Sequence, residues 1–437
     1  MAFVAVTTAG ASPAYIDRKR YWWLASLSGP LVPALTVAAY LQFNYALLLL
    51  VPLLYILGWI PLADSLCGED TDNPPDDVVP LMASDRFYKW LLYFDVALLY
   101  ANFLLAAWFV GTHELPLWAL LSFTLGVGLT SADAILIGHE LGHKQNRMDQ
   151  LAGRMALALV GYGHFTIEHN RGHHVHMATP EDCASSRMGE SVYRFACREL
   201  PGALRRGWRL EQQRLSRLGR GAISVHNEIL QTGALTLAVG ATLVAAFGAS
   251  MLPFVVLHHL YAWYGLTQAN YVEHYGLLRQ KLANGRYEPP APRHSWNTNH
   301  IYSNLISFHL QRHSDHHAHP LRPYQVLRDG PDLPRLPSGY PGCFGLAMIP
   351  SMWFKTMDPR LLAWASGDIT KINVDPAKRD ELYARYGAAS DRSGDSSGSI
   401  SSISRANAPR LEATSSSARS PMAVRSADDD SKLARAA

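Results

Sequence analysis

Six long apolar segments constrain what this chain can fold into more than any other feature of its sequence. They lie at 21–42, 44–63, 87–110, 117–138, 228–248 and 250–271, and apart from Lys89 none contains lysine or arginine. Each has the roughly 20 residues that an α-helix needs to cross a bilayer. Hydrophobic residues make up only 48% of the chain, so their concentration into segments is the informative fact. The segments predict an all-α integral membrane protein with six transmembrane helices.

The positions of basic residues predict how these helices are oriented. Arg18, Lys19 and Arg20 come directly before the first segment, and basic residues that flank a span stay on the cytoplasmic side. Segment 144–221 carries thirteen lysine and arginine residues, whereas the turns that would lie outside carry none. We therefore expect both termini and a histidine-rich cap to be cytoplasmic. The arginines are dispersed, which argues against nucleic-acid binding and favours anionic headgroups or an acidic protein partner.

Composition divides the chain into two parts. Residues 1–387 contain every apolar segment and every aromatic residue, and we expect them to form one membrane-embedded domain. Residues 388–437 are rich in serine, alanine, arginine and aspartate, which predicts a disordered tail. The four cysteines include no C-x-x-C pair, so neither a zinc ribbon nor a four-cysteine iron site is encoded.

Fifteen of the nineteen histidines fall near one predicted end of the spans. His139 and His143 form H-E-L-G-H, which also matches the H-E-x-x-H pattern of zinc peptidases. E-H-N-R-G-H-H at 168–174 and H-S-D-H-H at 313–317 place further histidines at helical spacings. Because buried imidazoles without metal would leave many donors and acceptors unpaired, the pattern predicts a metal centre. A catalytic zinc takes three protein ligands, so two ions fit better, and imidazole suits iron, copper and zinc alike.

Seven short motifs together carry a resemblance to a known family. They are H-E-L-G-H-K, E-H-N-R-G-H-H, A-T-P-E-D, R-M-G-E-S, N-Y-V-E-H-Y-G-L, H-S-W-N-T-N-H and L-Q-R-H-S-D-H-H-A-H-P. In this combination the chain resembles the integral-membrane alkane 1-monooxygenases of bacteria. These enzymes belong, with membrane fatty-acid desaturases and xylene monooxygenase, to a histidine-box diiron group. The resemblance extends from about residue 15 to residue 387.

The resemblance implies two iron ions held by nine histidines, which are His139, His143, His169, His173, His174, His274, His313, His316 and His317. It implies hydroxylation of the terminal methyl group of n-alkanes to 1-alkanols, with O₂ as co-substrate and the alkane arriving from the bilayer. Electrons would come from NAD(P)H through a reductase and a rubredoxin. The rubredoxin must be a separate protein, because the chain has no C-x-x-C pair, and the reductase is expected to be a separate protein as well. The implied location is the inner (cytoplasmic) membrane of a bacterium.

Five carboxylates next to these histidines are candidates for fixing the imidazole tautomers through the second ring nitrogen. They are Glu140, Glu168, Asp182, Glu273 and Asp315, and the alternative for each is a solvated or salt-bridged surface residue. Glu140 lies about 100° round the helix from His139. We therefore expect its side chain to face aside and to support the ligands, rather than to act as a peptidase base. In the second span, Tyr55 and Trp59 are candidates for closing a substrate tunnel, with simple packing as the alternative.

Three alternative functions fit fewer of these features. An intramembrane zinc protease explains H-E-L-G-H but leaves the other histidine clusters unused. A membrane fatty-acyl desaturase shares the histidine boxes and the diiron chemistry, but E-H-N-R-G-H-H and N-Y-V-E-H-Y-G disfavour it. A non-enzymatic metal-binding or transport protein would place histidines through the membrane rather than at one face.

Overall fold

The computed structural model describes residues 4–5 and 15–394. Within them the fold is helical, except for the two-residue strands β1 (Val4–Ala5) and β2 (Tyr15–Ile16), which pair antiparallel. By its contacts the chain divides into a unit of residues 1–392 and a second unit of residues 393–437. The last helix, α18 (Arg379–Gly394), includes the first residues of the segment predicted to be a disordered tail, and the rest of that segment lies outside the described residues.

The first two spans form a hairpin. Helices η1 (Arg20–Leu27) and α1 (Ser28–Phe43) make up the first span, and Asn44 then ends it in a left-handed conformation with φ of 49°. The second span consists of four short helices, η2 (Ala46–Leu50), α2 (Val51–Leu54), η3 (Tyr55–Trp59) and α3 (Ile60–Cys67). It has no single hydrogen-bond ladder, since Pro52 and Pro61 lack a backbone N–H to donate.

The third and fourth spans are each built from two helices. Helix α4 (Val79–Ser84) is followed by α5 (Arg86–Thr112), which Asp85 caps by accepting a 2.9 Å hydrogen bond from the Phe87 amide. Helices α6 (Leu117–Thr130) and α7 (Asp133–Gly142) meet at a turn. At this turn a Cβ on Gly265 would lie 2.8 Å from the Ala132 Cβ, so glycine permits the close approach.

The last two predicted spans form α12 (Glu228–Phe247) and α13 (Met251–His274). Of the described helices, five are long and apolar enough to cross a membrane, and they correspond to the first five predicted segments. Helix α13 is not among them. Its second half carries polar side chains such as Gln268 and Asn270, which are buried against the rest of the protein. Apolar composition therefore supports five of the six predicted spans.

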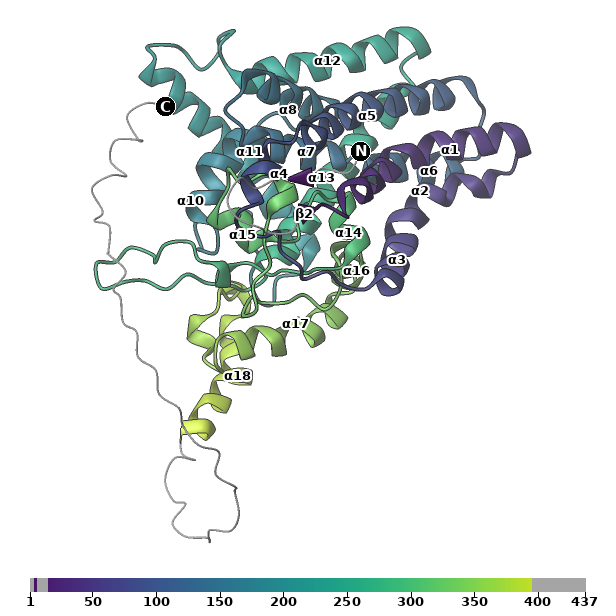
Figure 1. Cartoon of the computed structure of the whole chain (residues 1–437). Helices are drawn as coiled ribbons and strands as arrows, with labels where there is room; N and C mark the ends of the chain where they lie inside the picture. Colours follow the sequence, from purple (N-terminus) through teal and green to yellow (C-terminus); the bar gives the residue numbers. More distant parts are fainter. Residues whose placement is uncertain (1–3, 6–14, 395–437) are drawn as a thin grey trace. The chain divides into compact units, whose positions relative to one another are not determined.

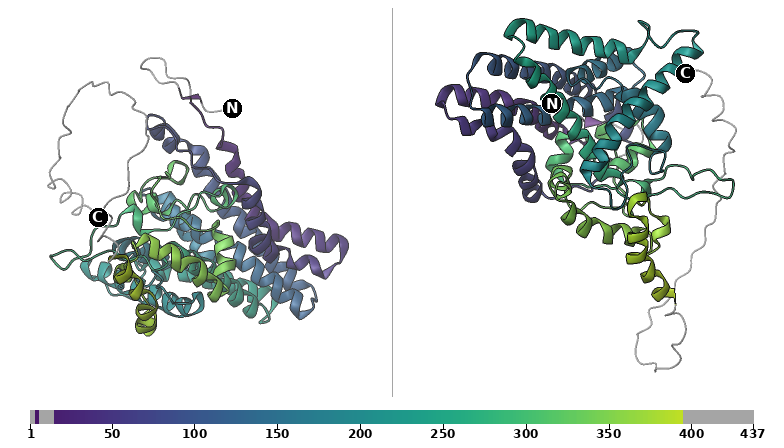
Figure 2. Two further views of the ribbon diagram at one scale, coloured as in Figure 1. Left: turned by 90° about the horizontal axis from the view of Figure 1, so that it is seen from below. Right: turned by 180° about the vertical axis from the view of Figure 1, so that it is seen from behind.

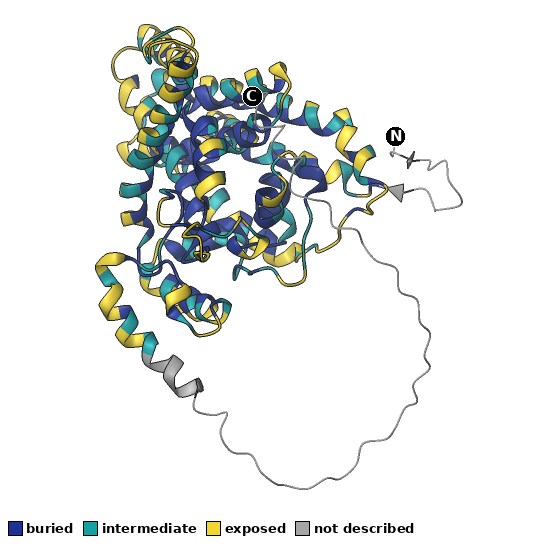
Figure 3. Cartoon of the chain, turned by 90° about the vertical axis from the view of Figure 1, so that its left-hand side faces the viewer, coloured by how far each residue is buried: buried dark blue, intermediate teal, exposed yellow. Residues whose placement is uncertain are grey.

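The spans run side by side, as α1, α5, α6 and α12 show in Figure 1 and again from behind in Figure 2. Many of their apolar side chains point outward: Leu35, Leu62 and Leu237 are 65%, 51% and 74% exposed. Exposed apolar surface of this extent suits contact with lipid. Figure 3 shows the contrast with the buried interior of the same unit.

The remaining helices build a cap on the spans. Before α12 they are α8 (Arg147–Leu159), α9 (Phe165–Glu168), η4 (His169–His173), α10 (His174–His176) and α11 (Val192–Arg217). After α13 they are η5 (Pro292–His294), α14 (Ile301–Ile306), α15 (His313–Ala318), η6 (Tyr324–Val326), α16 (Tyr340–Ala347), α17 (Pro350–Trp364), η7 (Ile369–Lys371) and η8 (Pro376–Lys378), before α18. The buried core of the cap includes residues from both sets.

Candidate metal centre

Eight of the nine predicted histidines form two groups, in each of which the ring nitrogens lie within 4.8 Å of one another. The first group, called group 1 here, consists of His139, His143, His169 and His316. The second, group 2, consists of His173, His274, His313 and His317. All eight side chains are buried. They come from α7, the segment 169–173, α13 and α15, so four elements that are distant in sequence meet at one place.

The ninth histidine, His174, lies between the two groups. Its Nε2 is 3.0 Å from the Nε2 of His169 and 3.1 Å from that of His316, both in group 1. Its ring centroid is 4.5 Å from that of His317 in group 2. His176, two residues further on, is exposed and its carbonyl oxygen accepts a hydrogen bond from the Thr179 hydroxyl.

Within each group the ring nitrogens point towards one another, as the ligands of a metal ion do. In group 1 the Nε2 atoms of His139 and His316 are 2.8 Å apart, and the buried Nε2 of His143 has no hydrogen-bond partner. In group 2 the Nε2 atoms of His313 and His317 are 2.9 Å apart, and the buried Nε2 of His173 has no partner. Convergent lone pairs that lack donors are costly unless a cation accepts them. The residues present therefore fit one metal ion in each group.

Burial keeps most of these imidazoles in the neutral form that binds metal. It lowers the pKa of His169 and His316 well below the ordinary value, and it is the main cause that lowers the pKa of His174 to about 2. His173 is different. Burial acts in the same direction there, but the carboxylate of Asp182 outweighs it and raises the pKa of His173.

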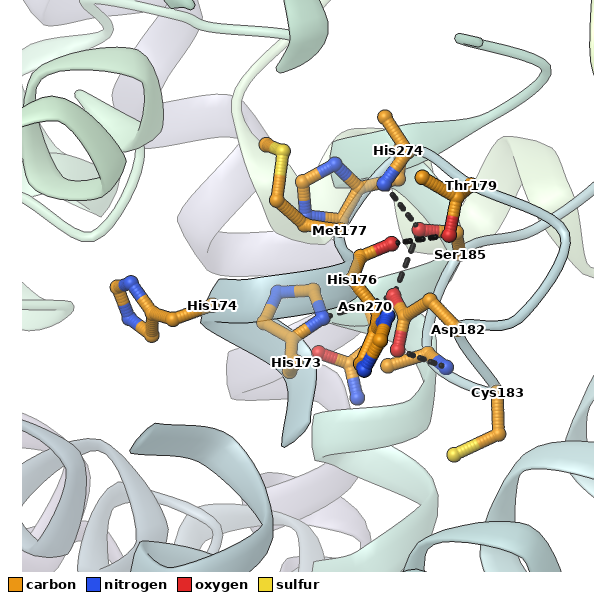
Figure 4. Close-up of polar contacts among 12 residues, drawn as sticks. His173, His174, His176, Met177, Thr179, Asp182, Cys183, Ser185, Asn270 and His274 are labelled. Atoms are coloured by element: carbon orange, nitrogen blue, oxygen red, sulfur yellow. Dashed lines mark hydrogen bonds and ion pairs between the residues drawn. The ribbon is translucent and has the colours of Figure 1, made fainter. Parts of the chain in front are cut away.

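Asp182 is the best-connected of the five predicted carboxylates. It lies 2.9 Å from the Nδ1 of His173 and accepts a 2.7 Å hydrogen bond from the Ser185 hydroxyl (Figure 4). Arg206 donates to Asp182 at 2.6 Å and, through its Nε, to Glu168 at 2.6 Å. The Nδ1 contact turns the Nε2 of His173 towards the other histidines of group 2, which fixes one tautomer for metal binding.

Sequence reasoning did not single out Arg206. It is one of thirteen basic residues in segment 144–221, and nothing in its local pattern separates it from the others. Its side chain is mostly buried because α11 packs against α9, which brings it between Glu168 and Asp182. Only the packing of these two helices reveals its position.

The other carboxylates lie in three different settings. Glu273 reaches to 3.3 Å from the Nε2 of His313, and its second oxygen is buried without a partner. Glu140 pairs with Lys144 at 2.7 Å and accepts a hydrogen bond from the backbone of the cap. Asp315 pairs with Arg322. Glu140 and Asp315 therefore hold neighbouring segments together rather than touching a ring nitrogen of the two groups.

An apolar cavity of about 80 Å³ lies between the second span, the fourth span, α13 and the cap. Ile56 and Leu136 are part of its wall, together with Leu310 from the cap. A narrower cavity of about 10 Å³ shares Leu136 and Leu310 with it and extends to His139 and His316. Apolar surface thus leads from between the spans to group 1.

The two residues predicted to close a substrate tunnel do not line this cavity. The hydroxyl of Tyr55 lies 2.7 Å from that of Ser28 and 3.2 Å from that of Tyr302, so the ring is held in a polar contact beside the cavity. Trp59 is 51% exposed. On the same helical span it is Ile56 that faces the cavity.

Comparison with known proteins agrees with this arrangement. Residues 114–335 match the fatty acid desaturase family, and this range contains all nine histidines. Fold and site together thus define a membrane protein with a histidine-rich metal site. The chain is 49% identical over 382 residues to alkane 1-monooxygenase 1 of Alcanivorax borkumensis, covering 87% of this chain and 94% of that protein.

A second relative is the alkane 1-monooxygenase of Ectopseudomonas oleovorans, which is 47% identical over 392 residues, covering 90% of this chain and 98% of that protein. The hydroxylase component of a xylene/toluene monooxygenase from Pseudomonas putida is 26% identical over 54% of this chain and 63% of that protein. The chain belongs to the alkane 1-monooxygenase family, which confirms the resemblance predicted from the motifs. The finding favours an oxidoreductase over the zinc protease.

Proposed function

We propose that this chain is a membrane diiron monooxygenase that hydroxylates the terminal methyl group of n-alkanes. The observation that carries the proposal is the pair of buried histidine groups, joined by His174, at the inner end of an apolar cavity between membrane helices. Membership of the alkane 1-monooxygenase family supports the reaction, and the apolar cavity supports an alkane substrate that arrives from the bilayer.

Nine histidines would hold the two iron ions: the four of group 1, the four of group 2, and His174 between them. When bound, the ions supply the oxidising power needed to break a terminal C–H bond with O₂, which no side chain can provide. One oxygen atom enters the alcohol, and the other leaves as water after two electrons and two protons are consumed. The protein's part is to hold the imidazoles neutral and fixed and to position the alkane.

The chain's own residues divide this work. Asp182 fixes the tautomer of His173, and the carbonyl oxygen of His294 does the same for His274 through a 3.1 Å contact to Nδ1. Leu136 and Leu310 keep the approach to group 1 apolar, so that a methyl group enters without water. Glu140, engaged with Lys144, does not act as a general base.

The partners and the location follow from the same proposal. A separate rubredoxin, reduced by an NAD(P)H-dependent rubredoxin reductase, delivers the electrons. The arginine-rich cap suits an acidic donor, and its charge supports a location on the cytoplasmic side of a bacterial inner membrane. In this arrangement α13 is the sixth span, residues 1–387 form the membrane-embedded catalytic domain, and both termini are cytoplasmic.

The test is reconstitution of the purified chain in lipid nanodiscs with rubredoxin, its reductase, NADH and n-alkanes of graded length. We expect 1-alkanols as products and two iron ions per chain by elemental analysis. One zinc ion per chain would contradict the diiron centre. An alkene formed from a fatty-acyl chain, in place of an alcohol from an alkane, would instead favour a desaturase.

A further inference from the structure

A pocket of about 220 Å³ lies on the cap, apart from the substrate cavity and from both histidine groups. Pro180 and Arg187 form one wall, and Asn373 and Arg379 form another. None of these residues lines the cavities that lead to the histidines. The pocket has room for several water molecules or one small solute, since a water molecule takes about 30 Å³.

Arg187 brings a positive charge to this pocket that Glu190 and Asp375 compensate only in part. Two carboxylates are near it, but each is already engaged: Glu190 pairs with Arg198 and Asp375 pairs with Arg194, both at 2.8 Å. Among the described residues, none forms an ion pair or hydrogen bond with the guanidinium of Arg187. Burial, with Arg198 as the second cause, lowers the pKa of Arg187, so a bound anion would relieve an existing cost.

Asn373 and Arg379 also line this pocket. The amide Nδ2 of Asn373 is buried and has no hydrogen-bond partner among the described residues, and the side chain is only 5% exposed. Arg379 lies 5.5 Å from the ring centroid of Tyr383, which also lines the pocket. The described lining of the pocket thus includes two arginines, Arg187 and Arg379, and no carboxylate.

We propose that this pocket, called the cap anion pocket here, binds a phosphate group. Guanidinium groups present paired N–H donors that match the oxygens of a phosphate. Apolar residues such as Leu278 and Ile372 form much of the remaining wall, together with the hydroxyl-bearing Thr370 and Tyr383. The phosphate comes either from solution, as inorganic phosphate, or from the headgroup of an anionic phospholipid.

The cap anion pocket is joined to group 2 through one backbone segment. Pro180 lies two residues before Asp182, the partner of His173. At the other end of the segment the Met188 amide donates a 2.8 Å hydrogen bond to the carbonyl oxygen of Asn373. A bound phosphate would therefore stabilise the loop that holds Asp182, in addition to stabilising the fold by mass action.

The experiment measures binding and thermal unfolding of the full chain without reference to turnover. Inorganic phosphate is titrated into the detergent-solubilised protein by calorimetry at constant ionic strength, with chloride as the reference anion. We expect saturable binding and a rise in Tm with phosphate. Arg379→Gln and Arg187→Gln should each weaken binding at least about tenfold, because each removes a charge-assisted contact. Arg385→Gln, on the same helix but outside the pocket, is the matched control and should leave binding unchanged.

A second experiment distinguishes inorganic phosphate from a phospholipid headgroup as the ligand. The protein is placed in nanodiscs of phosphatidylcholine with and without phosphatidylglycerol. A Tm increase with phosphatidylglycerol that Arg379→Gln removes, without saturable binding of inorganic phosphate, assigns the pocket to a lipid headgroup. The opposite pattern assigns it to free phosphate. Absence of both effects in the wild-type protein, or equal effects in Arg379→Gln and Arg385→Gln, overturns the proposal. Arg379 is exposed, so its variant should fold even where Arg187→Gln does not.

Discussion

The two histidine groups have the same number of ligand atoms but very different surroundings. Group 2 has carboxylates close by, since Asp182 contacts His173 and Glu273 lies 3.3 Å from His313. Group 1 has no carboxylate in contact with its histidines among the described residues, and His139 and His316 line the apolar passage to the cavity. The comparison suggests a division of labour. Group 2 is held by charge, whereas group 1 is open to an apolar substrate.

The strongest test of this division removes one ligand from each group. His313→Ala and His316→Ala should both abolish alkanol formation, because each takes a nitrogen from a buried centre that nothing else can replace. The measurement is product by gas chromatography together with iron content per chain. Turnover retained by either variant would show that the corresponding group is not a metal site, and the exposed His319→Ala is the control.

Arg206→Gln should produce the next largest effect, on stability. It leaves the carboxylates of Glu168 and Asp182 buried without their cation, and breaking a buried pair costs about 3–5 kcal/mol. We expect a lower Tm and poorer iron loading, measured by calorimetry and elemental analysis. Arg205→Gln, the exposed neighbour, should change neither. Equal behaviour of the two variants would mean that Arg206 does not support group 2.

Asp182→Asn keeps the shape of the side chain but removes its charge. The contact to the Nδ1 of His173 is weakened, so we expect iron affinity or activity to fall by about 10–100-fold. Titration of the iron-free protein with Fe²⁺ should show one site weakened and the other unchanged. Asp315→Asn, whose carboxylate pairs with Arg322 instead, should leave both sites intact. Loss of both iron sites in Asp182→Asn would show that Asp182 does not support group 2 alone.

Glu199 makes stability depend on pH near the same centre. Burial raises its pKa to about 7, against the hydrogen bonds from Thr267 and Asn270. A carboxyl group normally ionises near pH 4.3, so the folded state holds a proton that the unfolded state loses between about pH 4.3 and 7. Stability from this group is therefore present at low pH and lost as pH rises, on the order of 4 kcal/mol in all by pH 8, of which about 2 kcal/mol is lost between pH 5.5 and pH 8.

Glu199→Gln should remove that part of the pH dependence. Thermal unfolding at pH 5.5 and pH 8 checks it: the wild-type protein should lose more stability at pH 8 than the variant does. Glu381→Gln, at an exposed position of α18, serves as the reference. A wild-type protein that becomes more stable at pH 8 relative to Glu199→Gln would show that the carboxyl group is not held in its neutral form.

The smallest expected effect is on the preferred chain length of the alkane substrate. Ile56→Phe narrows the cavity that leads to group 1 and should shift the preferred alkane towards shorter chains by several-fold in relative rate, with iron content unchanged. Trp59→Phe, at an exposed position on the same span, should leave the preference as it is. A shift in the second variant alone would place the substrate path elsewhere.

Local sequence patterns determined much of this protein. Apolar length alone predicts helices that cross a membrane, because a bilayer fixes the number of residues a span needs, and five spans meet that criterion. Helical spacing also predicts the histidine clusters, since residues three or four positions apart share a face. Helix α13 does not meet the criterion of apolar composition, because the half of it that is buried in the protein carries polar side chains.

The assignment of each histidine to a group was decided only by the tertiary structure. His313 and His317, four residues apart, fall in one group, whereas His169 and His173, also four apart, fall in different groups. Spacing is a property of one helix, but each group is formed by residues of three elements that are separate in sequence. The same reason explains Arg206 and Asp182, which are 24 residues apart in sequence and meet because α11 packs across the segment that carries the histidines. The sequence determined which chemistry the chain carries, and packing decided which atoms perform it together.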